Sequence, residues 1–161
     1  MRQAVFILIV MAGLGGGRAA RAETVDRAPA SSEAARLIAE TSGLSMEESL
    51  PQIAPVLMRA SVLLPGDSEN EDGGTQANRS VTLLTARDKF GQEWFYAYTD
   101  EAELLKVFPE GARYVEMNFR DFLTTAESKP GIGGIFINSG SDDSYPIPKT
   151  FFSRLKQLAN H

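Results

Sequence analysis

Apolar residues recur along the chain with two spacings, one typical of α-helices and the other of β-strands. Apolar residues three and four positions apart place Phe119, Phe122 and Leu123 on one face of a helix that Asn118 can cap. Similar stripes and capping residues predict further helices at about residues 32–41, 46–59, 101–108 and 148–158. Short β-branched or apolar runs predict strands at residues 60–64, 81–85, 93–98, 113–117 and 134–138.

These helices and strands interleave along the sequence. Such an order favours one layered domain over separate all-α and all-β regions. We therefore predict a single α/β (α+β) domain over residues 32–161, in which a single-layer mixed sheet of about five strands packs with four or five helices. Within the second helix, Pro51 and Pro55 predict either a restart or a kink, because proline lacks the amide that a helix interior needs.

The predicted strand at residues 93–98 is unusually aromatic. Strand alternation sends Trp94, Tyr96 and Tyr98 to one face and Phe95 to the other. If helices cover both faces, all of these rings belong to the core. If one face is open, the amphipathic rings of Trp and Tyr form a recognition surface of the kind enriched in protein interfaces.

The segment at residues 67–79 has no large apolar residue and is predicted to be a solvated loop. Its crowded carboxylates suggest a calcium loop, but the EF-hand register fails, since Asp72 stands at the sixth position and Asn78 at the twelfth. We expect an acidic loop without a metal. Its four acids in the first half are Asp67, Glu69, Glu71 and Asp72.

Residues 1–22 have the features of a secretory signal peptide. Arg2 precedes an apolar stretch at residues 4–14, and small residues at Ala20 and Ala22 suit cleavage before Glu23. A stretch of about 11 apolar residues is shorter than the roughly 20 that a membrane-spanning helix needs. We therefore expect a periplasmic or secreted protein with no membrane span after cleavage, in which residues 23–31 form a flexible lead-in to the domain.

Charge and residue inventory exclude several functions. Cleavage would remove three of the 16 basic residues and none of the 21 acidic ones, so the formal charge would fall from −5 to −8. Such a balance disfavours nucleic acids and anionic membranes as partners. The chain has no Cys, and its sole histidine is the last residue, His161. Catalytic triads, thiolate chemistry and histidine metal sites are therefore not expected, and we expect no cofactor.

Several short motifs resemble the N-terminal domain of the SseB family, named for an enhanced serine sensitivity phenotype. The resemblance covers about three quarters of residues 23–161 and implies a fold more than a reaction, because the family has no established catalytic residues. A signal peptide is unexpected for this family. The matching segments are residues 88–91 before the aromatic strand, Tyr98-Thr99-Asp100-Glu101, the helix from Phe119 to Leu123, and Gly134-Ile135-Phe136-Ile137-Asn138.

We predict an exported, non-catalytic protein-interaction module that selects a basic protein partner by charge complementarity. The candidate partner-binding residues are Trp94, Tyr96, Tyr98, Asp67, Glu69, Glu71 and Asp72. One alternative is a small-ligand-binding protein or an enzyme that pairs Glu93 or Asp100 with Tyr98. Another is a cytoplasmic domain of the same family that starts at an internal methionine such as Met46.

Overall fold

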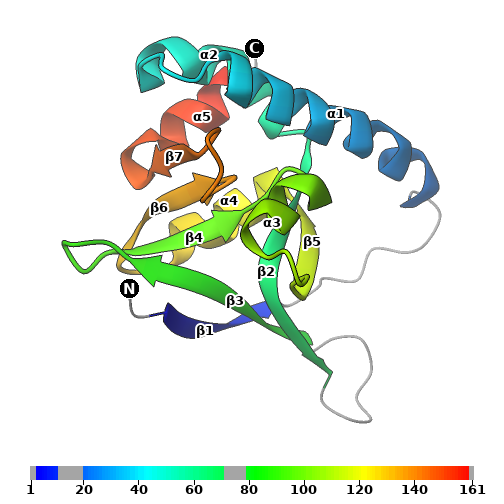
Figure 1. Cartoon of the computed structure of the whole chain (residues 1–161), viewed down its shortest axis with the longest axis vertical. Coiled ribbons are helices and arrows are strands. Elements are labelled where there is room, and N and C mark those ends of the chain that lie inside the picture. Colours follow the sequence, from blue (N-terminus) through cyan, green and yellow to red (C-terminus); the bar gives the residue numbers. More distant parts are fainter. Residues whose placement is uncertain (1–2, 11–19, 71–78, 160–161) are drawn as a thin grey trace.

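A computed structural model of the chain (Figure 1) describes residues 3–10, 20–70 and 79–159. Within these ranges it has five α-helices, one short 3-10 helix and seven strands. The helices are α1 (Ala20–Glu40), α2 (Met46–Leu57), α3 (Glu101–Val107), α4 (Phe119–Ser128), η1 (Lys149–Phe151) and α5 (Phe152–Leu158). The strands are β1 (Gln3–Val10), β2 (Ser61–Asn70), β3 (Arg79–Arg87), β4 (Glu93–Ala97), β5 (Tyr114–Asn118), β6 (Ile132–Ile137) and β7 (Tyr145–Pro148).

The strands form one mixed sheet, which confirms the predicted α/β class. Their order is β5-β2-β3-β4-β6-β7, and β1 pairs with β3 outside this path. The β4 and β6 strands run parallel, whereas the other pairs are antiparallel. In register, Phe95 stands between Thr85 on β3 and Ile135 on β6, so these three residues share one face of the sheet.

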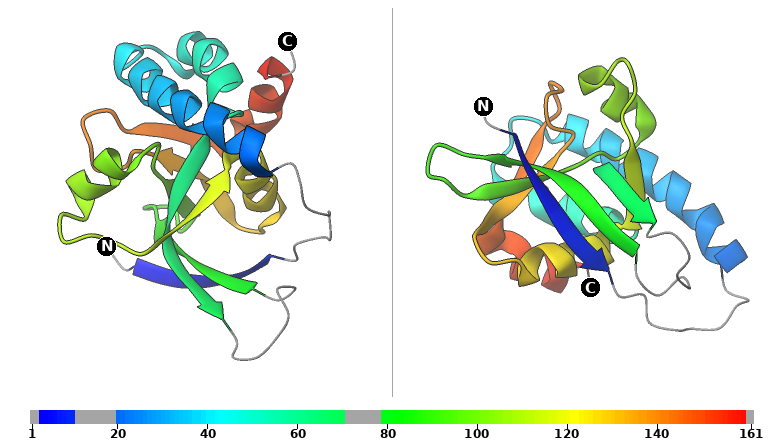
Figure 2. Two further views of the ribbon diagram at one scale, coloured as in Figure 1. Left: turned by 90° about the vertical axis from the view of Figure 1, so that its right-hand side faces the viewer. Right: turned by 90° about the horizontal axis from the view of Figure 1, so that it is seen from below.

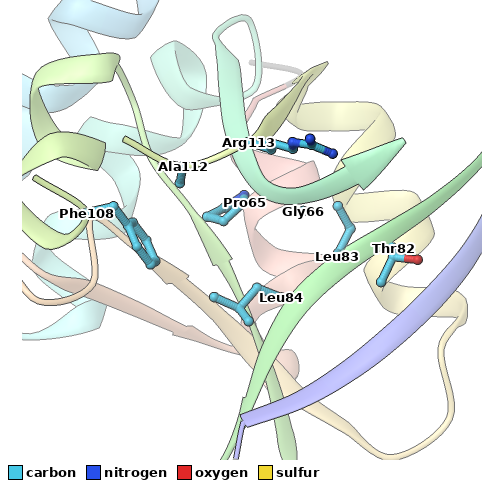
Figure 3. Close-up of a pocket in the computed structure, with 8 residues that line it drawn as sticks. All are labelled: Pro65, Gly66, Thr82, Leu83, Leu84, Phe108, Ala112 and Arg113. Atoms are coloured by element: carbon cyan, nitrogen blue, oxygen red, sulfur yellow. The ribbon is translucent and has the colours of Figure 1, made fainter. Parts of the chain in front are cut away.

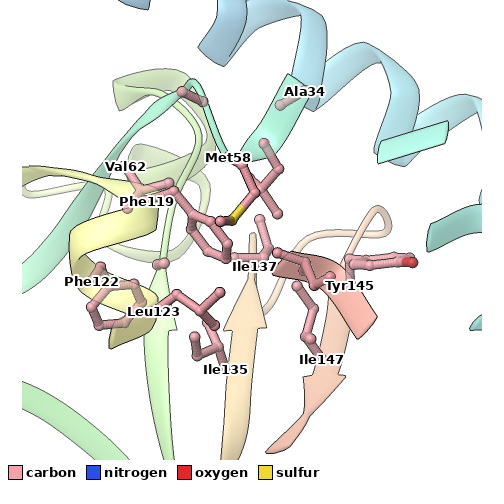
Figure 4. Close-up of a cluster of buried hydrophobic side chains, with 14 of the residues drawn as sticks. Ala34, Met58, Val62, Phe119, Phe122, Leu123, Ile135, Ile137, Tyr145 and Ile147 are labelled. Atoms are coloured by element: carbon pink, nitrogen blue, oxygen red, sulfur yellow. The ribbon is translucent and has the colours of Figure 1, made fainter. Parts of the chain in front are cut away.

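That face carries the main hydrophobic core, and we call it the core face. Helices α1, α2, α4 and α5 pack over it (Figure 4). The predicted stripe of α4 is confirmed, because Phe119, Phe122 and Leu123 are fully buried. Phe122 meets Phe95 edge to face with ring centroids 5.5 Å apart. The opposite face, which we call the outer face, is covered in part by α3 (Figures 1 and 2).

Two segments expected to be irregular have regular backbone structure. The expected lead-in at residues 23–31 is helical, because α1 begins at Ala20 and not near Ser32. Tertiary contacts explain the difference, since Ala30 is buried and the Ser31 hydroxyl donates to the Ser61 carbonyl at 2.8 Å. The expected loop after residue 66 is also shorter, because β2 continues to Asn70 and pairs with β3.

Helix α2 runs unbroken through Pro51 and Pro55. Each proline removes one helical hydrogen bond, at a cost of about 3 kcal/mol in a helix interior. Burial of the apolar side offsets this cost, because Leu50, Ile53 and Leu57 are almost completely buried. Ser45 and Glu48 form a capping box at its start. Packing therefore overrides the local preference for a break.

Candidate partner-binding surface

Three aromatic side chains from neighbouring strands form a cluster on the outer face. Trp94 and Tyr96 alternate with the buried Phe95 and Ala97 along β4, so they project away from the core. Phe136 of β6 stands beside Tyr96 in register. Ring centroids are 4.6 Å apart for Trp94 and Phe136 and 6.4 Å apart for Tyr96 and Phe136. All three side chains are partly exposed, and we call them the aromatic cluster.

Two glycines of β6 make room for the Trp94 indole. A Cβ atom at Gly134 would fall 2.4 Å from the Trp94 ring, and one at Gly133 would fall 2.7 Å from its Nε1. Both distances are far below van der Waals contact. The indole therefore lies directly on the β6 backbone, where a residue with a side chain would displace it.

Asp88 fixes both the β3–β4 turn and the orientation of the indole. Its Oδ1 accepts from the amides of Phe90 at 2.8 Å and Gln92 at 3.0 Å, and its Oδ2 accepts from Trp94 Nε1 at 3.1 Å. Desolvation raises the pKa of Asp88, but hydrogen bonds from the Trp94 indole and from these amides outweigh it and hold the pKa below its ordinary value. The same turn presents Phe90, which is 78% exposed.

Tyr98 does not belong to the accessible surface, which corrects its assignment as a partner-binding residue. It is 1% exposed and meets Phe108, just after α3, edge to face at 6.3 Å. Its hydroxyl donates to the Ser139 carbonyl at 3.1 Å. Burial, with a smaller effect of Tyr96, raises the pKa of Tyr98 to about 12. The aromatic side of β4 is thus core at Tyr98 and partly open at Trp94 and Tyr96.

The motif residues at the strand ends have structural roles. The side-chain Oδ1 of Asn138 accepts from the backbone amide of Thr99 at 2.9 Å. The backbone amide of Asn138 donates to the Ala97 carbonyl at 2.9 Å. Asp100 caps α3 by accepting from the Glu103 amide at 2.9 Å. The carboxyl ends of parallel strands are the usual ligand site of open α/β sheets. Here buried side chains and α3 fill that position.

The carboxylates and the tyrosine considered for an enzyme each have other partners. Glu93 bonds Lys129 Nζ at 2.6 Å and Arg87 at 3.2 Å. The hydrogen bond from Lys129 chiefly lowers the pKa of Glu93, against an opposing desolvation effect and with help from Arg87. Alternation places Glu93 on the core face and Tyr98 on the outer face. Asp100 is engaged at the start of α3, as described above.

The acidic segment and the aromatic strand both lie beside β3. Asp67 and Glu69 lie on β2 and pair in register with Thr82 and Ser80. Because Thr85 of β3 pairs with β4, the acidic and aromatic segments border the same strand one after the other. Glu71 and Asp72 lie outside the described residues. Within residues 3–10, 20–70 and 79–159, no three acidic or histidine side chains converge as ligands for a metal ion.

A pocket of ≈ 290 Å³ opens on the outer face beside β3 (Figure 3). Pro65 of β2, Leu84 of β3 and Phe108 after α3 form its apolar walls, and their side chains converge in the close-up. Ala112 and the neighbouring Arg113 complete the rim. Sequence reasoning missed this pocket because its walls come from three segments distant in sequence, and none carries a local motif.

Comparison with known proteins identifies the family. In the described part of the chain, no helix is both long and apolar enough to cross a bilayer. No curated protein and no solved structure gives a significant match. The family model of the SseB protein N-terminal domain matches residues 34–152, which is most of the chain and includes both the aromatic cluster and the Thr99–Asn138 junction. The chain therefore belongs to the SseB N-terminal domain family.

Proposed function

We propose that the chain is a non-catalytic protein-binding domain whose outer face docks a partner protein. The observation that carries the proposal is the aromatic cluster of Trp94, Tyr96 and Phe136, which is partly exposed yet held in place. Clusters of aromatic residues on a rigid scaffold supply much of the binding energy in protein interfaces. The titratable groups considered for catalysis are engaged in helix capping, ion pairing and burial, which also supports a binding role.

Preorganisation makes this surface suitable for binding. The hydrogen bond to Asp88 and the close packing on Gly133 and Gly134 hold the Trp94 indole in one orientation before any partner binds. Ordering a free side chain on binding costs about 0.5–1.5 kcal/mol, and a side chain already held loses less. The neighbouring pocket at Leu84 and Phe108 offers room for an apolar side chain of the partner.

We further propose that the partner is basic. The whole chain has a formal charge of −5, and Asp67 and Glu69 border the same strand as the aromatic cluster. Opposite charge accelerates association and favours matching partners, and salt weakens this effect. Association should therefore slow as ionic strength rises, whereas a partner held only by apolar contacts would show little change.

Substitution at the aromatic cluster tests the docking site. Tyr96→Ala and Trp94→Ala should each weaken capture of the native partner by about 2 kcal/mol, roughly 30-fold in Kd. The matched control is Leu44→Ala, because Leu44 is 47% exposed between α1 and α2, the helices that pack over the core face. Circular dichroism checks that each variant is folded. If all three variants bind as the unmodified chain does, the proposed docking site is wrong.

We also propose that the protein is exported, so that it functions in the periplasm or outside the cell. The support is the tripartite pattern of residues 1–22. N-terminal sequencing of the protein purified from its native cells should recover Glu23 as the first residue. Recovery of Met1, or of an internal start such as Met46, would contradict export and leave the docking proposal to stand on its own test.

A further inference from the structure

Both edges of β3 are paired in the full-length chain. Along one edge, β2 pairs with β3 from Asn70↔Arg79 to Gly66↔Leu83, and β4 follows from Thr85↔Phe95 onward. The other edge is paired with β1, antiparallel, from Val10↔Arg79 to Gln3↔Ala86 (Figure 2, right). The strand that closes this second edge lies within the predicted signal peptide. Its removal would leave an eight-residue stretch of β3 without a neighbouring strand along this edge.

We propose that the β3 edge at residues 79–86 is a strand-acceptor site, opened by removal of residues 1–22 and filled by an extended apolar segment of the partner protein. The added segment runs antiparallel to β3 and takes the register of β1. This inference rests on the export part of the proposed function. An exposed edge strand attracts other strands, and strand addition is a common mode of peptide recognition.

The residues of β3 specify the chemistry of the segment that binds. Leu83 is 2% exposed on the core face while β1 is present, and Leu84 lines the pocket on the outer face. Residues paired with these two leucines lie on opposite faces and both meet apolar surface. A segment that is apolar on both faces and free of proline fits this site. The β1 strand has this composition, because every residue after Gln3 is apolar.

The β3 edge lies close to the aromatic cluster. A strand added to β3 lies two strands from β4, which is roughly 10 Å at the usual spacing of about 4.8 Å. The protein that carries this strand would therefore extend over Trp94 and Tyr96. A single partner can thus use both features, main-chain pairing for the edge and side-chain contacts for the cluster.

The domain has the means to fold without β1. Every described member of the buried core cluster lies at Ala30 or beyond, and the family match begins at residue 34. Residues 23–161 therefore retain the core face, the other six strands and all helices, with α1 shorter by its first three residues. The two forms of the chain, 1–161 and 23–161, can be compared directly.

Amide hydrogen exchange tests the proposal. In 23–161 the β3 amides that face β1 in the precursor should exchange at least about tenfold faster than in 1–161, because they lose their hydrogen-bond partners. The probe is a synthetic peptide with the sequence of residues 3–10 between terminal lysines. It should restore protection to 23–161, and the same peptide with Ile7→Pro should not, since proline interrupts strand pairing.

Three outcomes would overturn the proposal. Equal exchange in the two forms would mean that β1 does not protect the edge. Equal protection by the proline peptide would indicate apolar adhesion without strand addition. Protection in 23–161 that rises with protein concentration would assign the edge to a second copy of the chain. None of these outcomes depends on Tyr96, so the docking test on the aromatic cluster can succeed or fail separately.

Discussion

Asn138 holds a backbone conformation that residues with side chains rarely adopt. Its φ is 51°, in the left-handed region, and its side chain is buried against Thr99. Asparagine tolerates this region better than most residues, and glycine tolerates it best. The family motif therefore combines two requirements at one position, namely a left-handed turn after β6 and an acceptor for the Thr99 amide.

Two substitutions separate these requirements. Asn138→Gly keeps the backbone conformation but leaves the buried Thr99 amide without this acceptor, so it should cost about 1–3 kcal/mol of the free energy of unfolding. Asn138→Ala adds the strain of a left-handed alanine, about 1–2 kcal/mol more. Urea unfolding measures both values. Equal losses in the two variants would show that the backbone conformation contributes nothing.

Asp88 connects the turn to the aromatic cluster through a single carboxylate. In Asp88→Asn an amide nitrogen can replace Oδ2 opposite the Trp94 indole, while Oδ1 still accepts from the turn amides. The indole then loses its acceptor although the turn remains. Because Trp94 is the sole tryptophan, its fluorescence should change without a change in far-UV circular dichroism. Unchanged emission would show that the Asp88 carboxylate does not hold the Trp94 indole.

The same carboxylate predicts a pH dependence. The folded-state pKa of Asp88 lies below its ordinary value of 3.8. Its stabilising contribution is therefore complete above that value and is lost as the pH falls through the folded-state pKa. Trp94 emission should stay constant on acidification to the ordinary pKa and change below it. Asp88→Asn should lack this step, and a step of the same size in the variant would assign it to another group.

At the scale of elements, prediction from sequence succeeded where the local pattern and the tertiary environment agree. The α4 stripe of Phe119, Phe122 and Leu123 and the strands at residues 81–85 and 93–98 were predicted from the local pattern, and all are present. Strand β7 was missed, because its four residues include two prolines and gain their conformation by pairing with β6. The pairing of residues 3–10 with β3 was not predicted either, because no local pattern specifies it.

The aromatic strand marks the limit of sequence reasoning about the site. Alternation correctly grouped Trp94, Tyr96 and Tyr98 on one face. It cannot tell which part of that face α3 covers. Tyr98 lies next to α3 and is buried, whereas Trp94 is beyond it and partly open. Exposure depends on how α3 folds back over the sheet, so only the structure separates them.

Glu93 and Lys129 connect the start of β4 to the end of α4. Lys129 is 8% exposed in its side chain, and its ammonium group also lies 5.0 Å from the centre of the Phe95 ring. Removing one partner of such a nearly buried pair, as in Glu93→Gln or Lys129→Met, should cost about 3 kcal/mol. The double variant should cost clearly less than the sum, as measured by urea unfolding. Additive losses would mean that the two groups do not interact.

At the scale of the whole molecule, the two faces of the sheet differ in what they contact. The core face holds the helices and supplies stability, and the outer face leaves the aromatic cluster and a pocket accessible beside α3. The acidic residues of β2 border the same strand as the cluster.

We expect association with a basic partner to be slower in Asp67→Asn/Glu69→Gln, with little change in dissociation, because long-range charge acts mainly on encounter. Stopped-flow kinetics at low and high salt would measure this, and an effect confined to dissociation would contradict it.

Photo-crosslinking in the native cells tests the docking surface most directly. A photoreactive phenylalanine analogue replaces Tyr96 in one strain and Leu44 in another, so that the same probe stands on the outer face in one protein and between α1 and α2 in the other. We predict one dominant protein adduct from position 96 and none of that mass from position 44. The same adducts from both positions, or none from position 96 in a folded protein, would contradict the claim that the outer aromatic face binds a partner.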